Sequence, residues 1–210
     1  MRRFAFIACA IIALCLVPSF AQDADKQDKP DAQRIPWPMG PATQLENVLH
    51  LRGVVVVKGY TDIGTITGDY NDSVRVTAVE LTTPGTSEKA SGLAITVHQG
   101  GDPIVESVSY VDFDEIDAML AALETIAKLE GAAATTMQHY DADYRTRGEL
   151  ELANVDREGV RFLRVQSTVF LPTTQVVVAA ALFPANRTGE LRRQIEAARN
   201  ALTKTRAAAK

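Results

Sequence analysis

Residues 104–127 read IVESVSYVDFDEIDAMLAALETIA and place a strand directly before a helix. The strand is expected over residues 104–111. The helix follows from one apolar stripe with helical spacing, formed by Ile116, Met119, Leu120, Leu123, Ile126 and Ala127. Gly131 is expected to end it. This strand followed directly by a helix is the reference point for predicting the elements on either side of it.

Three further strands are predicted upstream of this unit. Residues 53–66 (GVVVVKGYTDIGTI) form a β-rich run, and residues 74–81 (VRVTAVEL) follow a turn at 71–73. In this second run the alternation of apolar residues changes phase at Val79 and Leu81, which predicts a β-bulge. Leu93, Ile95 and Val97 mark the third strand, which stops at residues 99–103 (QGGDP).

The second half repeats this plan. Strands are expected near residues 138–155, 160–171 and 175–183, followed by a helix whose apolar stripe is Leu191, Ile195, Ala198 and Leu202. The run VVVAAALF at residues 176–183 is apolar in both phases, which favours a central strand covered on both faces.

The predicted fold class is therefore α+β, with mainly antiparallel sheet in two strand-rich halves that are each followed by a helix. This double plan is similar in topology to the Whirly and PUR-type nucleic-acid-binding folds. A seven-stranded sheet closed by a C-terminal helix is similar to a pleckstrin-homology-like barrel. A likeness of topology does not fix a function.

The amino terminus has the pattern of a cleavable secretory signal peptide. Arg2 and Arg3 precede an apolar run of about 14 residues, shorter than the roughly 20 that span a bilayer, and Ser19-Phe20-Ala21 predicts cleavage between Ala21 and Gln22. The alternative is a lipid anchor on Cys15, although Leu14 is bulkier than the residue such sites prefer. We therefore expect a periplasmic or secreted protein without a transmembrane segment after cleavage.

Cleavage would remove both cysteines of the chain, Cys9 and Cys15, so disulfides and thiolate chemistry are not expected in the mature protein. It would also remove Arg2 and Arg3, which lowers the 22 basic residues to 20 against 26 acidic ones and gives a formal charge of −6. Because nucleic-acid-binding proteins usually carry a basic face, this balance makes a nucleic-acid partner unlikely.

The expected organisation is a signal peptide (1–21), a disordered Pro- and Asp-rich linker (22–44), one domain (45–203) and a flexible basic tail (204–210). Within the linker, residues 35–39 (IPWPM) hold the only tryptophan. This apolar segment either covers part of the domain or binds a partner, and the first interpretation is favoured.

The candidate metal site is His139, Asp141 and Asp143, which strand periodicity places on one face, opposite Tyr140 and Tyr144. Same-face neighbours on a strand are about 7 Å apart, so a metal would need further ligands from another strand. The competing interpretation is a solvated face whose charge is balanced by nearby arginines.

Three other groups of residues are candidates for chemistry. The acidic residues Asp112, Asp114, Glu115 and Asp117 are more typical of helix capping than of calcium binding, since the EF-hand spacing is absent. His50 and His98 lack any accompanying hydrolase motif. Basic residues in the last helix and tail form either a solvent face or an anion-binding face: Arg187, Arg192, Arg193, Arg199, Lys204, Arg206 and Lys210.

These features predict an exported, non-enzymatic binding or structural domain of the bacterial cell envelope, with no cofactor and with an unknown protein or small ligand as its partner. The alternative is a metal-dependent or other hydrolase of unrecognised class.

Overall fold

The computed structural model describes residues 43–68, 71–85, 88–129, 140–157, 159–170 and 176–208. The first half consists of α1 (Gln44–Leu49), β1 (Val57–Thr67), β2 (Ser73–Thr82), β3 (Lys89–Gln99), β4 (Val105–Asp112), the 3-10 turn η2 (Phe113–Glu115) and α2 (Ile116–Lys128). The second half consists of β5 (Asp141–Arg145), β6 (Leu150–Arg157), β7 (Val160–Phe170), β8 (Val176–Pro184), the 3-10 turn η3 (Ala185–Arg187) and α4 (Thr188–Ala208).

Each half forms one four-stranded antiparallel sheet in which neighbouring strands pair in chain order. The first sheet has the order β1-β2-β3-β4 and the second has the order β5-β6-β7-β8. Each sheet is followed by a helix, which confirms the predicted α+β class and its two-half plan. The observed arrangement is the repeated plan, with two sheets and two helices, and not a single seven-stranded sheet closed by one helix.

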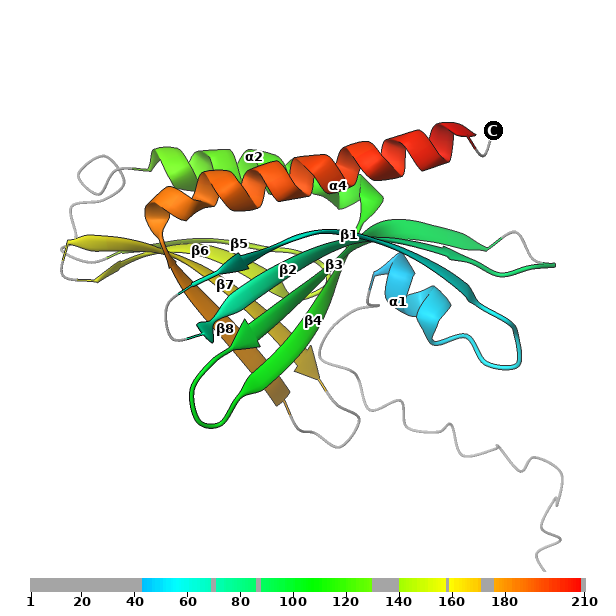
Figure 1. The fold of residues 1–210 in the computed structure, drawn as a ribbon, viewed down its shortest axis with the longest axis horizontal. Coiled ribbons are helices and arrows are strands. Elements are labelled where there is room, and N and C mark those ends of the chain that lie inside the picture. The colour runs from blue at the N-terminus through cyan, green and yellow to red at the C-terminus, as the bar shows by residue number, and fades with distance from the viewer. Residues whose placement is uncertain are drawn as a thin grey trace, which may run out of the picture. The chain divides into compact units, whose positions relative to one another are not determined.

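The two long helices lie side by side over the sheets, and each packs on the sheet of the other half (Figure 1). Helix α4 packs mainly on β1 and β2, whereas α2 contacts β5 and β6. The sheets also meet each other through β3 and β4 on one side and β7 and β8 on the other. Because each helix covers the sheet of the other half, the two halves share one hydrophobic core.

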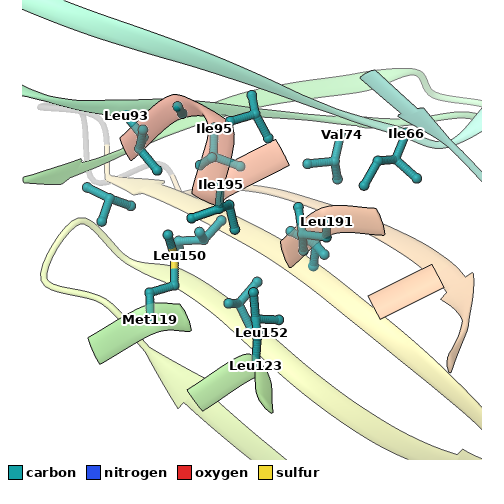
Figure 2. Close-up of a cluster of buried hydrophobic side chains, with 14 of the residues drawn as sticks. Ile66, Val74, Leu93, Ile95, Met119, Leu123, Leu150, Leu152, Leu191 and Ile195 are labelled. Atoms are coloured by element: carbon teal, nitrogen blue, oxygen red, sulfur yellow. The ribbon is translucent and has the colours of Figure 1, made fainter. Parts of the chain in front are cut away.

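This core confirms the predicted helix stripes. Of the α2 stripe, Ile116, Met119, Leu120, Leu123 and Ile126 are buried, whereas Ala127 is exposed. All four stripe residues of α4 are buried. Figure 2 shows Met119 and Leu123 of α2 and Leu191 and Ile195 of α4 beside side chains from both sheets, including Ile95.

The bulge expected in β2 is wrong, because β2 pairs continuously with β3 and the irregularity lies in β1, between Asp62 and Gly64. The phase change in β2 has another cause. Val74, Val76 and Ala78 face the main core, whereas Val79 and Leu81 belong to a second cluster on the opposite face, under α1. Burial on both faces makes a regular strand look irregular in sequence.

Helix α1 itself was not predicted, and it lies where the expected linker meets the domain. Thr43 and Glu46 form a capping box at its start, with the Thr43 hydroxyl accepting from the Glu46 N–H and the Glu46 carboxylate accepting from the Thr43 N–H. Leu45 and Val48 are buried in the second cluster. At the other end of the chain, α4 continues to Ala208 and so includes residues 204–208, which were expected to be a tail.

The expectation that β8 is a central strand is also wrong, because β8 is the edge of the second sheet. Two of its outward N–H groups are nevertheless bonded by side chains of the first half. Ala180 donates to Gln99 Oε1 at 3.0 Å, and Leu182 donates to Asp72 Oδ2 at 3.2 Å. A partner outside its own sheet explains why this edge carries so apolar a sequence.

The signal peptide, its cysteines, most of the linker with residues 35–39, and Gly131 lie outside the described residues. Among the helices that the structure does describe, none is long and apolar enough to cross a membrane.

Candidate functional site

The three residues of the predicted metal site are only partly covered by the structure. His139 lies outside the described residues, while Asp141 and Asp143 are exposed on β5 and share one face. Tyr144, on the opposite face, packs against the main core, so the expected alternation is present in this strand. Asp141 Oδ2 lies 4.0 Å from Nη1 of Arg164. The described ranges contain no group of three or more His, Cys, Asp or Glu residues arranged to hold a metal ion.

The face that carries these aspartates is organised around Glu151 of β6. Its carboxylate accepts from Arg145 Nη2 at 2.7 Å and from Arg164 Nη2 at 2.6 Å. Burial alone would raise the pKa of Glu151, but the hydrogen bonds and charges of the two arginines outweigh it and lower this pKa. Glu151, Arg145, Arg164 and Asp141 therefore form an internal ion-pair network.

The acidic residues before α2 also have basic partners. Arg147, in the turn between β5 and β6, contacts Asp114 at 2.5 Å, Glu115 at 3.3 Å and Asp112 at 3.7 Å. Asp117 pairs with Arg199 of α4 at 2.6 Å. The predicted capping role is wrong, because neither η2 nor α2 has a side-chain cap hydrogen bond.

Asp112 instead caps a different helix. Its buried carboxylate accepts from the Gln44 N–H at 2.7 Å and from the Leu45 N–H at 3.1 Å, at the start of α1. The pairing with Arg147 was not predictable from spacing, since that residue lies 33 positions after Asp114 in the chain. The acidic group therefore joins α1 and the second half to the first sheet.

The histidines and the basic residues of α4 were the remaining candidates. His50 is exposed at the end of α1, and His98 lies near the end of β3 with Nδ1 3.7 Å from Glu106. Four of the α4-region arginines have partners: Arg187 with Glu190, Arg192 with Glu196, Arg199 with Asp117, and Arg206 over the ring of Phe113. Within the described residues, three of the seven predicted basic residues are thus paired with carboxylates, whereas Arg206 keeps its charge over an aromatic ring.

A pocket that none of these candidates includes lies between the end of α2, β6, the start of β7 and the start of α4. Its volume is about 250 Å³. Its wall combines apolar and polar side chains with a helix start, and it is formed by Ile126, Ala127, Asn154, Arg161, Phe162, Leu163, Ala185, Asn186 and Thr188. The volume is slightly below the range of about 300–1,000 Å³ for small-molecule sites, which suits a ligand the size of one amino acid.

Asn154 is the polar group at the base of this pocket. Only 4% of the residue is exposed. Its side-chain Nδ2 donates to the Ile126 carbonyl at 3.5 Å, while Oδ1 is buried and has no hydrogen-bond partner within the described part of the chain. Buried polar atoms are almost always paired, so an unpaired acceptor on a residue that lines a pocket needs an explanation.

The start of α4 supplies hydrogen-bond donors to the pocket, in contrast to the acceptor of Asn154. The turn η3 leads directly into this helix of 21 residues, and no side-chain hydrogen bond caps the start of η3. The Thr188 hydroxyl donates to the Ala185 carbonyl at 2.7 Å. The N–H groups at a helix start and the helix dipole favour an anion, and the exposed Arg161 adds a positive charge on the same wall.

The pocket thus offers one buried acceptor, a set of donors with positive potential, and an apolar wall. No protein-family model matches this chain, and no curated protein matches it either. Its function must therefore be argued from the site.

Sequence reasoning missed this pocket, although one signal was present. In β6, Leu150, Leu152 and Asn154 occupy the same phase, and the first two are core residues. A polar residue at an inward position interrupts an otherwise apolar face and marks a candidate site. The helix start and Arg161 gave no comparable signal, because only the tertiary structure brings them beside Asn154.

Proposed function

We propose that this chain is an exported, non-enzymatic binding module of the cell envelope, and that the pocket around Asn154 is its ligand site. The proposal of export rests on the amino-terminal pattern: a basic start, a short apolar run and a cleavage motif ending at Ala21. The proposal of binding rests on the pocket.

The observation that carries the binding proposal is the buried, unpartnered Oδ1 of Asn154. Leaving such an acceptor without a donor costs about 1–3 kcal/mol. A ligand that brings an N–H or O–H into the pocket would recover this free energy on binding. The unpaired atom therefore favours occupancy by a hydrogen-bond donor.

The other residues that line the pocket restrict which functional groups a ligand can carry. The uncapped turn η3 at the start of α4 and the guanidinium of Arg161 favour a carboxylate or a similar anion. Ile126, Phe162 and Leu163 favour an apolar group. A small carboxylate with a neighbouring N–H and an apolar side chain satisfies all three, and an N-acylated amino acid or the carboxyl end of a peptide is such a compound.

The same wall favours binding over catalysis. Its polar side chains are two amides, one hydroxyl and one guanidinium. General acid–base catalysis uses a group that exchanges a proton near the working pH, and none of these four side chains does so. They are groups that orient and hold a ligand.

Ligand-observed NMR with three matched probes tests the proposal. N-acetyl-leucine carries the carboxylate, the N–H and the apolar group, its methyl ester lacks the negative charge, and its N-methyl derivative lacks the N–H. We expect N-acetyl-leucine to bind most tightly and each derivative to lose about tenfold, the effect of about 1.4 kcal/mol.

The matched variants are Asn154→Ala, which removes the unpaired acceptor, and Asn47→Ala, the same change at an exposed position of α1. Asn154→Ala should abolish the preference for the probe with the N–H, whereas Asn47→Ala should leave it intact. Equal binding of all three probes, or an unchanged preference in Asn154→Ala, would contradict the proposed site.

A further inference from the structure

The first half of β1 is an exposed strand edge. Strand β1 lies at the edge of the first sheet, where the structure gives it one neighbour, β2. Every residue from 57 to 62 is exposed, although this stretch pairs with β2 in unbroken register. Unpaired backbone N–H and C=O groups on such an edge are a template for another strand.

Large apolar side chains are concentrated in the first half of β1 and in the segment just before it. Val55 is 70% exposed, Tyr60 is 60% exposed, Val57 is 51% exposed and Val54 is 45% exposed. They are four of the eight large hydrophobic residues that are exposed in the described part of the chain. Clustering of this kind indicates a surface that is covered in an assembly.

The charged residues of β1 indicate which partner strand would fit this edge. Lys58, Tyr60 and Asp62 point to the same face of the sheet, two residues apart. If a second copy of β1 pairs antiparallel about a two-fold axis at Tyr60, Lys58 of each copy faces Asp62 of the other. The two tyrosines then face each other as a cross-strand aromatic pair.

The same charges exclude the neighbouring registers. A two-fold axis at Lys58 would place two ammonium groups opposite each other, and an axis at Asp62 would do the same for two carboxylates, and like charges directly opposite are destabilising. The irregularity at Ile63, between Asp62 and Gly64, ends the regular stretch on one side. One self-pairing register is thus favoured over the others.

We propose that β1 is the interface of a symmetric homodimer, in which residues 58–62 of two copies of this chain pair antiparallel about Tyr60. The interface is isologous, because each copy contributes the same surface. Pairing satisfies the free backbone groups of both edges and joins two first sheets into one continuous eight-stranded sheet. This proposal does not depend on the pocket around Asn154.

Cysteine cross-linking tests this geometry in the full chain. With Cys9→Ser and Cys15→Ser, Tyr60→Cys becomes the sole thiol. In the proposed register the two introduced Cβ atoms lie about 4.5–5.5 Å apart, close to the separation that a disulfide spans. Thr65→Cys is the control, because this exposed residue of the same strand lies beyond the proposed paired stretch and therefore does not face its own copy.

We expect mild oxidation to convert most of the Tyr60→Cys protein into a covalent dimer and to leave Thr65→Cys largely monomeric. Absence of the Tyr60→Cys dimer, or equal cross-linking of both variants, would overturn the register.

Charge reversal tests the identity of the partner. Lys58→Asp and Asp62→Lys each replace two attractive contacts by two repulsive ones, and sedimentation velocity should show a dimer dissociation constant raised about tenfold or more. The double variant should restore it. Lys89→Asp, at an exposed position of β3, is the control. A parent protein that is monomeric at about 100 μM, or a double variant no better than the single ones, would contradict self-pairing.

Discussion

The structural role of the acidic group before α2 can be tested with Asp112→Asn, which keeps the shape of the side chain and removes its charge. Asp112 is 2% exposed and accepts two backbone N–H groups from α1 while facing Arg147. Asparagine has one acceptor oxygen, and its NH₂ group would be directed at a backbone N–H.

The magnitude follows from these contacts. A hydrogen bond to a charged group contributes about 1.5–3 kcal/mol, and a neutral one about 0.5–1.5 kcal/mol. Asp112→Asn loses one charged bond and weakens the other, so the free energy of unfolding should fall by about 2–4 kcal/mol. Asp114→Asn is the matched control. Asp114 pairs with the same arginine but is 64% exposed, so its loss should cost less than about 1 kcal/mol.

Urea denaturation followed by circular dichroism measures both free energies. We expect the midpoint of Asp112→Asn to fall well below that of Asp114→Asn, with similar slopes. If the two variants were equally mild, the carboxylate of Asp112 would not hold α1 to the first sheet, and the account of the acidic group would be refuted.

The remaining predictions concern the core, the ion-pair network and processing. Leu123→Ala should cost about 2–5 kcal/mol because its fully buried side chain leaves a cavity, whereas Lys128→Ala should change stability by less than about 0.5 kcal/mol in the same urea assay. The pKa of Glu151 is lowered in the folded state, so its contribution to stability is present above its unfolded pKa of about 4.3 and is lost as the pH falls through the folded value. Glu151→Gln should therefore flatten the acid side of the curve of stability against pH, and an unchanged curve would contradict this role. Intact-mass measurement of protein from the native envelope should find Gln22 as the first residue, and retained Met1 or a lipid on Cys15 would refute cleavage at Ala21.

The sequence was sufficient to predict the elements that have one apolar face. The stripes of α2 and α4 and the alternation in β3 each have one buried side, and periodicity reports that situation directly. Periodicity gave wrong predictions where a strand does not have one buried and one exposed face. Strand β2 is buried on both faces by α1 and the helix layer, and two outward N–H groups of β8 are bonded by Asp72 and Gln99. Neither situation has a periodicity of its own.

For the candidate sites, too, the sequence predicted which residues share a face but not which residues pair with them. Asp141 and Asp143 share one face of β5, as alternation requires. Their arginine partners come from other strands, and Arg147 reaches the acidic group from the second half. Apart from the inward position of Asn154, the sequence carries no sign of the pocket, because its walls come from elements that only the tertiary structure brings together.

The most direct test of the proposed function is the location of the bound ligand. A titration of N-acetyl-leucine followed by ¹⁵N–¹H correlation spectra should produce saturable shifts of the Asn154 side-chain amide and of the backbone amides of Asn186 and Thr188. Shifts confined to other parts of the domain, or none at millimolar ligand, would contradict the assignment of this pocket as the binding site.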